Sequence, residues 1–245
     1  MHRSVPILGL LMLAAGAIGS AQLPEERDVP SPLDRSLPPS ARLEAVAERV
    51  RRAHDSLETL EAEFSQRKQS ALLLEPDVAT GRFSYTAPDK VRWEYLSPDP
   101  ISLVIADRTM TTWYRDIGQV ERAAVGAQAD RVLRYLGAGT SLDRLLEYFT
   151  VSLSVSAKEG EPLKLKLSPR FERVARRIQE MELWLDPGLY LPVRLRYVEG
   201  DGDVTEYNFA NFRKNEGIPS DRFELEWPEE VEVREVQLDS RAGAR

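Results

Sequence analysis

Long stretches of this sequence alternate apolar and polar residues one by one, and this feature restricts the fold more than any other. Six runs after Thr150 show it: VSLSVS, PLKLKLS, IQEMELWLD, LPVRLRYVE, VTEYNFANF and FELEWP. Successive side chains of a β-strand point to opposite faces, so each run predicts a strand with one face in water and the other against a shared interior. The turn signals DPG at 186–188 and GDGD at 200–203 separate runs at hairpin distances and predict an antiparallel meander.

A β-hairpin is predicted at 81–98, where the sequence reads GRFSYTAPDKVRWEYLSP. Two alternating runs flank Pro88 and Asp89, which are residue types that favour turns. One face of the hairpin is apolar and mostly aromatic, and it carries Phe83, Tyr85, Val91, Trp93 and Tyr95. Such a face must cover something apolar. The sequence leaves open whether it covers the protein's own core or a guest molecule.

Two more strands are predicted directly after the hairpin, at 101–106 (ISLVIA) and 109–115 (TMTTWYR). A long helix is predicted from an N-cap at Ser40, because apolar residues then recur at intervals of three and four. These residues are Leu43, Val46, Val50, Ala53, Leu57, Leu60 and Phe64. Two short helices with the same spacing are predicted at 127–137 and 140–149. We therefore expect a mainly β fold in which three helices cover part of a strongly curved or barrel-like sheet.

The two ends of the chain differ in composition from the rest. Arg3, an apolar run at 5–18 and the small residues before Gln22 have the order of a cleavable secretory signal, so we expect cleavage after Ala21. Residues 22–39 are rich in Pro and charge and are expected to form a flexible leader. Residues 40–236 are expected to form a single domain, and 237–245 a polar tail. From the predicted signal we expect that the protein is exported to the periplasm.

The composition argues against several classes of function. A formal net charge of −7 disfavours nucleic acid as a partner, and the chain has no cysteine for a disulfide or a lipid anchor. The only histidines are His2, which would leave with the signal, and His54, which lies beside the apolar stripe of the long helix. A His-based metal site or catalytic triad is therefore not expected. We expect no cofactor and no metal, and an enzyme hypothesis would depend on acidic residues that no spacing singles out.

Four arginines cluster at Arg170, Arg173, Arg176 and Arg177. Such a cluster suits a docking patch for an acidic partner or a lipid headgroup, and it equally suits a solvated edge of the sheet. The sequence leaves both interpretations open.

Taken in order, these features resemble the periplasmic outer-membrane lipoprotein carrier family, LolA. The resemblance covers most of the mature chain and rests on four blocks: a helix ending in EFSQRK, the hairpin GRFSYTAPDKVRWEYLSP, the strand ADRTMTTWY and the C-terminal YNFANFRKNEGIPSDRFELEWPEEVEV. It implies a half-open antiparallel β-barrel lidded by helices around an apolar cavity for lipoprotein acyl chains. It also implies an inner-membrane ABC transporter that loads the carrier and an outer-membrane receptor that unloads it. We expect no enzymatic activity, because the acidic residues have no telling arrangement and the Trp and Arg residues are explained as wall and surface.

The resemblance carries Val91, Trp93 and Trp113 over by position as residues of the cavity wall. Alternation and helical spacing extend the predicted acyl-chain lining to Phe83, Tyr85, Tyr95, Leu103, Ile105, Leu133, Leu136, Leu145 and Phe149. Family members often have an arginine just before the hairpin proline, where it bonds to the lid helices. This chain has Ala87 there, which puts that latch in doubt.

A monomeric carrier is the main hypothesis. The alternative of another class is a periplasmic sensor or regulatory module on the same scaffold, for which a protein partner matters more than lipid transport. Ordinary core packing is the simpler explanation for every aromatic residue named above.

Overall fold

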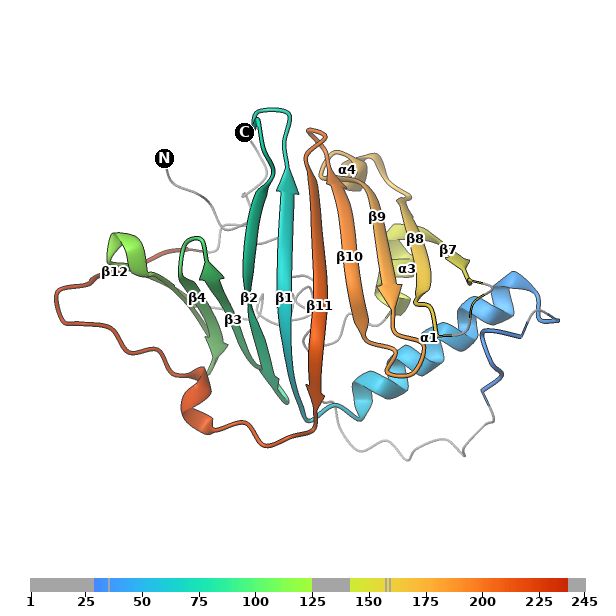
Figure 1. Ribbon diagram of the computed structural model, residues 1–245, viewed down its shortest axis with the longest axis horizontal. Helices are drawn as coiled ribbons and strands as arrows, with labels where there is room; N and C mark the ends of the chain where they lie inside the picture. Colours follow the sequence, from blue (N-terminus) through green and yellow to red (C-terminus); the bar gives the residue numbers. More distant parts are fainter. Residues whose placement is uncertain (1–28, 35, 125–141, 157, 159, 238–245) are drawn as a thin grey trace.

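The structure, a computed structural model, describes residues 29–34, 36–124, 142–156, 158 and 160–237. Twelve strands form one sheet in the order β12-β6-β5-β4-β3-β2-β1-β11-β10-β9-β8-β7 (Figure 1). The strands are β1 (Thr59–Gln69), β2 (Asp77–Thr86), β3 (Lys90–Ser97), β4 (Ile101–Ala106), β5 (Thr109–Tyr114), β6 (Gln119–Ala124), β7 (Phe149–Ser154), β8 (Leu163–Pro169), β9 (Ile178–Leu185), β10 (Pro192–Glu199), β11 (Val204–Lys214) and β12 (Glu232–Glu235). The helices are α1 (Pro39–Asp55), α3 (Leu142–Tyr148) and α4 (Glu172–Ala175), with 3-10 turns η2 (Arg115–Ile117) and η3 (Ser220–Phe223).

The structure is mainly β with few helices, as predicted, but the sheet is neither closed nor strongly curled. Its end strands, β12 and β7, lie at opposite ends of the order and do not pair with each other. Every pair of neighbours is antiparallel except β12 and β6, which are parallel, so the sheet is mixed. Residues 215–231 connect β11, in the middle of the sheet, to β12 at its edge.

The period of two in the sequence becomes two chemically different faces of the sheet. Cross-strand pairs such as Phe83 with Trp93, and Trp93 with Leu103, put the apolar residues of successive strands on one face. Apolar residues also pair with one another on the other side of β1, where Leu195 pairs with both Tyr207 and Leu183. This face contains most of the buried core.

The predicted long helix extends too far toward the C-terminus. Helix α1 begins at Pro39 after an N-cap at Pro38 rather than at Ser40, and it ends at Asp55. Leu60 and Phe64 instead belong to β1. Their spacing of four suits either a helix face or one face of a strand, and burial of Leu60, Ala62 and Phe64 against the sheet decides for the strand.

Four other segments depart from the sequence prediction. Phe149, expected at the end of a helix, is the first residue of β7, directly after α3. FELEWP does not form a strand: Phe223 ends η3, and the segment that follows lies against the sheet, where Arg92 Nη1 donates to the carbonyl oxygens of Arg222 (3.0 Å) and Glu224 (3.4 Å). Strands β6 and β12 were not predicted. The predicted helix at 127–137 lies outside the described residues.

The remaining predicted strands are confirmed, including the hairpin β2–β3 and the meander β7 to β11. The hairpin turn contains a cis peptide bond between Ala87 and Pro88. Part of the predicted flexible leader is described and lies against α1, where Arg42 Nε donates to the carbonyl oxygen of Pro32 (2.9 Å) and Arg49 Nη2 to that of Val29 (2.8 Å).

Candidate functional site

The apolar face of the sheet is concave, and we refer to it as the concave face. Strands β3 and β11 are separated by two strands, so they would be about 14 Å apart in a flat sheet. The ring centroids of Trp93 on β3 and Phe209 on β11 nevertheless lie 6.1 Å apart, and the hydroxyl oxygens of Tyr95 and Tyr207 lie 3.4 Å apart. Side chains from non-adjacent strands therefore converge.

A cluster of aromatic rings occupies the middle of the concave face. Phe64 lies 4.8 Å from Trp93 and 5.1 Å from Tyr95 between ring centroids, and Trp93 also contacts Phe83 at 5.2 Å. Gly81 makes room for this cluster, because a Cβ atom there would overlap the ring of Phe64. The rings pack against one another in this structure as they do in a protein core.

Most of the predicted lining residues lie together on this face. Seven residues from β2, β3 and β4 are buried there: Phe83, Tyr85, Val91, Trp93, Tyr95, Leu103 and Ile105. Phe149 is also buried in this core, and Leu145 on α3 packs half-buried against it. Leu133 and Leu136 lie outside the described residues.

Trp113 lies on the opposite face, contrary to its predicted place in the wall. It pairs with Ser102, which in turn pairs with Glu94, so all three point away from Trp93. The indole is half-buried beneath the guanidinium of Arg115, whose Cζ lies 4.4 Å from the ring centroid. Strand β5 directs Met110 and Thr112 to the concave face instead, because the register of the β4–β5 pair fixes the alternation.

The other half of the concave face consists of residues that were not among the predicted lining. Strands β8 to β11 contribute the buried apolar residues Leu163, Leu165, Leu167, Ile178, Met181, Leu183, Leu185, Leu195, Tyr197, Tyr207 and Phe209. The signal was present in the alternating leucines of PLKLKLS. It predicted the strand, but the tertiary structure was needed to show that this strand faces the same interior as the hairpin.

A small polar group interrupts the concave face near β1. The hydroxyl of Tyr95 donates to Oε1 of Gln66 at 2.8 Å, next to the hydroxyl of Tyr207. Burial is the main cause that raises the pKa of both tyrosines, so they are neutral hydrogen-bonding groups at physiological pH. The centre of the face can therefore offer hydrogen bonds without offering charge.

The convex face, on the other side of the sheet, carries charged residues over β8 to β11. Nζ of Lys164 lies 2.5 Å from Oε1 of Glu182, Nζ of Lys166 lies 2.6 Å from Oε2 of Glu180, and Arg196 lies between the two carboxylates at 3.5 and 3.7 Å. These pairs run across neighbouring strands, as the register requires. This part of the convex face is adapted to water.

Over β3 to β5, the convex face carries a more enclosed ionic group. Oε1 of Glu94 lies 2.6 Å from Nη2 of Arg92 and 3.6 Å from Nη2 of Arg115. Burial raises the pKa of Glu94, but the guanidinium groups of Arg92, Arg222 and Arg115 outweigh it and hold that pKa below its usual value. The carboxylate is therefore charged at physiological pH.

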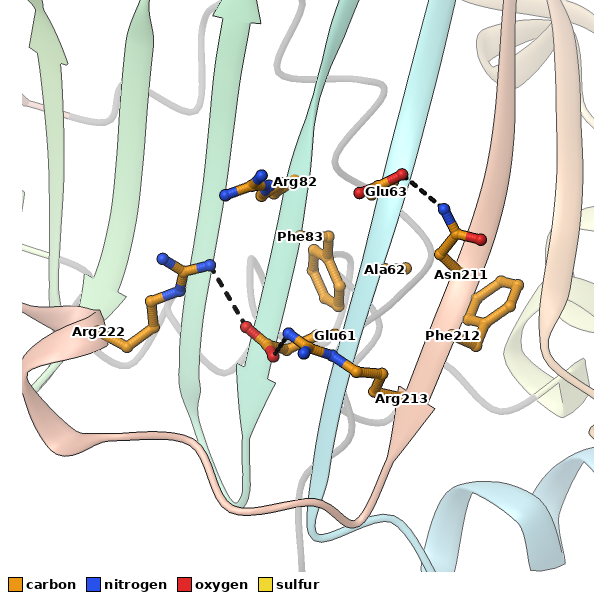
Figure 2. A pocket seen from close by; sticks show the side chains of 9 residues that line it. All are labelled: Glu61, Ala62, Glu63, Arg82, Phe83, Asn211, Phe212, Arg213 and Arg222. Carbon is orange, nitrogen blue, oxygen red and sulfur yellow. Dashed lines mark hydrogen bonds and ion pairs between the residues drawn. The ribbon is translucent and has the colours of Figure 1, made fainter.

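A groove of about 530 Å³ crosses the convex face between β2, β1, β11 and η3 (Figure 2). Glu61 pairs with Arg213 and, at 3.3 Å, with Arg222, while Glu63 accepts a hydrogen bond of 2.6 Å from Asn211. The lining of this groove is thus polar and charged, and it does not suit an apolar ligand. A second pocket, of about 500 Å³, lies between β4–β6 and the segment that contains Phe223 and Trp227.

Helix α1 packs against the β7 end of the sheet and against α3. Its buried residues Val46 and Ala47 belong to the core of the concave face. Ala87 packs on the same core, and its backbone N–H donates to the carbonyl oxygen of Glu58 at 2.8 Å. On the helix, the guanidinium of Arg49 lies over the ring of Tyr190 in the β9–β10 turn, with Cζ 5.6 Å from the ring centroid.

Within the part of the chain that the structure describes, no three His, Asp or Glu side chains come together in a way that could hold a metal ion. His54 lies near the end of α1 with Nδ1 3.6 Å from Oδ1 of Asp55. No helix among the same residues has the length and apolarity needed to cross a membrane.

Comparison with known proteins identifies the family to which the chain belongs. Residues 55–226 match the family described as outer membrane lipoprotein carrier protein LolA. The chain is 27% identical over 187 residues to an outer-membrane lipoprotein carrier protein of Alkalilimnicola ehrlichii, covering 76% of this chain and 81% of that protein. It is also 27% identical over 181 residues to one from Chromobacterium violaceum, covering 71% of this chain and 80% of that protein.

Among solved structures, an uncharacterized conserved protein from Thermus thermophilus shares the fold, with a TM-score of 0.53 and 14% identity over 79% of this chain and 99% of that one. The family match spans about 70% of the chain, namely 172 of its 245 residues. The chain belongs to the LolA family of outer membrane lipoprotein carrier proteins, which are periplasmic, non-enzymatic transport proteins.

Proposed function

We propose that this protein binds the acyl chains of lipoproteins against its concave face and carries them from the inner to the outer membrane. The observation that carries the proposal is the extent of that face, which is apolar across β1 to β4 and β8 to β11 apart from the polar group at Gln66, Tyr95 and Tyr207. An acyl chain of about fifteen methylenes that leaves a membrane loses roughly 12 kcal/mol of apolar burial, at about 0.8 kcal/mol per CH₂. A carrier must replace that burial, and no other face of the described sheet is as apolar.

Acyl chains would reach this face when the elements packed on it move. Helix α1 buries only a narrow stripe around Val46, so its displacement exposes few of its own apolar side chains. Weak closure suits a shuttle, because cargo must also leave. With alanine at position 87, we propose that Arg49 helps to hold α1 closed through its contact with Tyr190. Replacement of Arg49 by Ala would then speed both loading and release.

The cellular setting is part of the same proposal. Residues 1–21 would direct export and be removed after Ala21, residues 22–39 would form a leader, and residues 40–236 would form the carrier domain of a monomer, followed by the tail at 237–245. An inner-membrane ABC transporter would load the carrier, and an outer-membrane receptor would unload it.

A photo-crosslinking experiment tests the binding face without altering the fold. A triacylated lipopeptide with a diazirine in one acyl chain is incubated with the mature protein and irradiated, and the labelled peptides are identified by mass spectrometry. We expect labels on peptides that contain Trp93, Tyr207 or Leu165. The same peptide without acyl chains, carrying the diazirine on its backbone, is the matched control and should not label these peptides.

Two outcomes would overturn the proposal. Labels concentrated on convex-face residues such as Trp184 would place the chains on the wrong face of the sheet. A protein that captures no lipopeptide, and that retains one signalling protein from the periplasm in its place, would favour the sensor or regulatory alternative.

A further inference from the structure

Three consecutive leucines form the tip of the β1–β2 hairpin. Leu72, Leu73 and Leu74 have exposed fractions of 94%, 49% and 106%, so the first and third are as exposed as side chains of an extended chain. The hairpin rises beyond the neighbouring strands (Figure 1). None of the three belongs to the apolar core.

The fold presents these leucines to the outside. Ser70 closes the turn: its hydroxyl oxygen accepts a hydrogen bond from the N–H of Leu72 (3.2 Å), and its carbonyl oxygen accepts one from the N–H of Leu73 (3.1 Å). A turn at the end of a hairpin needs small or polar residues rather than leucines. The leucines therefore do nothing for the turn, and their exposure needs another explanation.

The exposed Phe171 and the arginine cluster at 170–177 lie at the same end of the sheet as the leucine tip. Nζ of Lys68 on β1 lies 3.4 Å from Oε1 of Glu199 and 3.3 Å from Oδ2 of Asp203, which flank the β10–β11 turn. The N–H of Gly200 in that turn donates to the carbonyl oxygen of Arg177 at 2.9 Å, next to α4. A continuous series of contacts thus connects the base of the leucine tip to the α4 segment, residues 170–177 (Figure 1).

The α4 segment has the chemistry of a headgroup contact. Phe171 is 46% exposed, and Cζ of Arg173 lies 5.4 Å from its ring centroid. Glu172 is paired with Arg176 at 2.9 Å, whereas Arg170 and Arg173 have no ion pair among the described residues. The nearby carboxylates of Glu199 and Asp203 are engaged by Lys68, so unpaired positive charge remains beside the exposed ring.

We propose that this end of the molecule, the leucine tip together with the α4 segment, docks on the surface of a lipid bilayer. The proposal goes beyond acyl-chain binding, because it concerns the carrier itself and an unloaded protein would show it. A bilayer suits this end better than a protein partner does, because projecting leucines can enter a fluid interface without a preformed pocket and the unpaired arginines beside Phe171 match anionic headgroups. Arginines at the same end can reach headgroup phosphates while the apolar side chains enter the interface.

Vesicle sedimentation with the unloaded mature protein tests this inference. We expect binding to vesicles of phosphatidylethanolamine and phosphatidylglycerol, and a loss of about tenfold in partitioning for the double variant Leu72→Ser, Leu74→Ser. The matched control is Leu189→Ser. Leu189 is 40% exposed in the β9–β10 turn at the opposite end of the sheet, so its replacement should leave vesicle binding unchanged.

The arginines are tested separately. Replacement of Arg170 and Arg173 by Gln should weaken binding to vesicles that contain phosphatidylglycerol, and leave the weaker binding to phosphatidylcholine vesicles as it is. Absence of vesicle binding by the wild-type protein would overturn the proposal, as would an equal loss in the Leu189→Ser control. Photo-crosslinking of the acylated lipopeptide should be the same in the tip variant and the wild type, so failure of this proposal is separable from failure of the carrier function.

Discussion

The two faces of the sheet are built from the same strands, but different interactions stabilise them: apolar burial on the concave face and ion pairs near water on the convex face. On the concave face, Leu165 of β8 lies between Leu153 of β7 and Leu183 of β9 and is completely buried. On the convex face, the next residue of the same strand, Lys166, pairs with Glu180 in partial contact with water. Substitutions on the concave face should therefore reduce the free energy of unfolding several times more than substitutions on the convex face, although the residues are neighbours in sequence.

The sharpest test of this difference places a charge on each face. Leu165→Glu should destabilise the protein by about 5 kcal/mol or prevent folding, because a carboxylate without a partner would be buried. Ser152→Glu is the control: Ser152 is exposed on β7 and pairs with Lys166, so a change within about 0.5 kcal/mol is expected. Urea unfolding followed by circular dichroism measures both, and equal losses would contradict the assignment of faces.

Replacing one tryptophan on each face by alanine compares the stability of the two faces in a second way. Trp93→Ala should cost about 4 kcal/mol, because it removes the ring that Phe64 and Phe83 pack against and leaves a cavity. Trp184 lies on the convex face between Lys164 and Arg194, whose cationic groups are 4.8 and 4.5 Å from its ring centroid. Trp184→Ala should cost about 1 kcal/mol. Similar midpoints in urea for the two variants would show that Trp93 is not a core residue.

The enclosed ionic group of the convex face should give an intermediate effect that depends on pH. Glu94→Gln should cost about 2 kcal/mol at neutral pH, because it leaves Arg92 without its charged partner. The pKa of Glu94 is lowered in the folded state, so its contribution is present above the unfolded value and is lost as pH falls through the folded value. The stability difference between variant and wild type should therefore shrink in acid, and a difference that stays constant across that range would exclude Glu94 as its source.

The smallest effect is expected in the exposed ion pairs of β8 and β9. Glu180→Gln should cost about 0.5 kcal/mol, because water screens its pairs with Lys166 and Arg196. Added salt should reduce this cost further. A thermal unfolding series at rising salt concentration would measure it, and a cost as large as that of Glu94→Gln would mean that the convex face is less hydrated than its exposure indicates.

The sequence prediction was accurate where a pattern fits only one kind of secondary structure, and it failed where a pattern fits two. Alternation over eight residues, as in the strand that contains Val91 and Trp93, fits only a strand, and the structure confirmed it. Leu60 and Phe64 are four residues apart, which fits a helix and a strand equally, and here the prediction was wrong. Trp113 was placed by resemblance alone, whereas a register shift of one residue decides which face a side chain takes.

The sequence by itself determined that this chain would be mainly β, that its strands would have one apolar face, and that the apolar face of the hairpin would be buried. These properties follow from local periodicity, which needs no information about distant residues. Only the tertiary structure decided that the leucines of β8 and β9 share an interior with Trp93, and that Trp113 lies opposite it. It alone showed that the leucine tip and the arginine cluster lie at one end of the sheet. Those relations depend on strand order and register, which are set by contacts between residues far apart in the chain, such as Phe64 and Phe209.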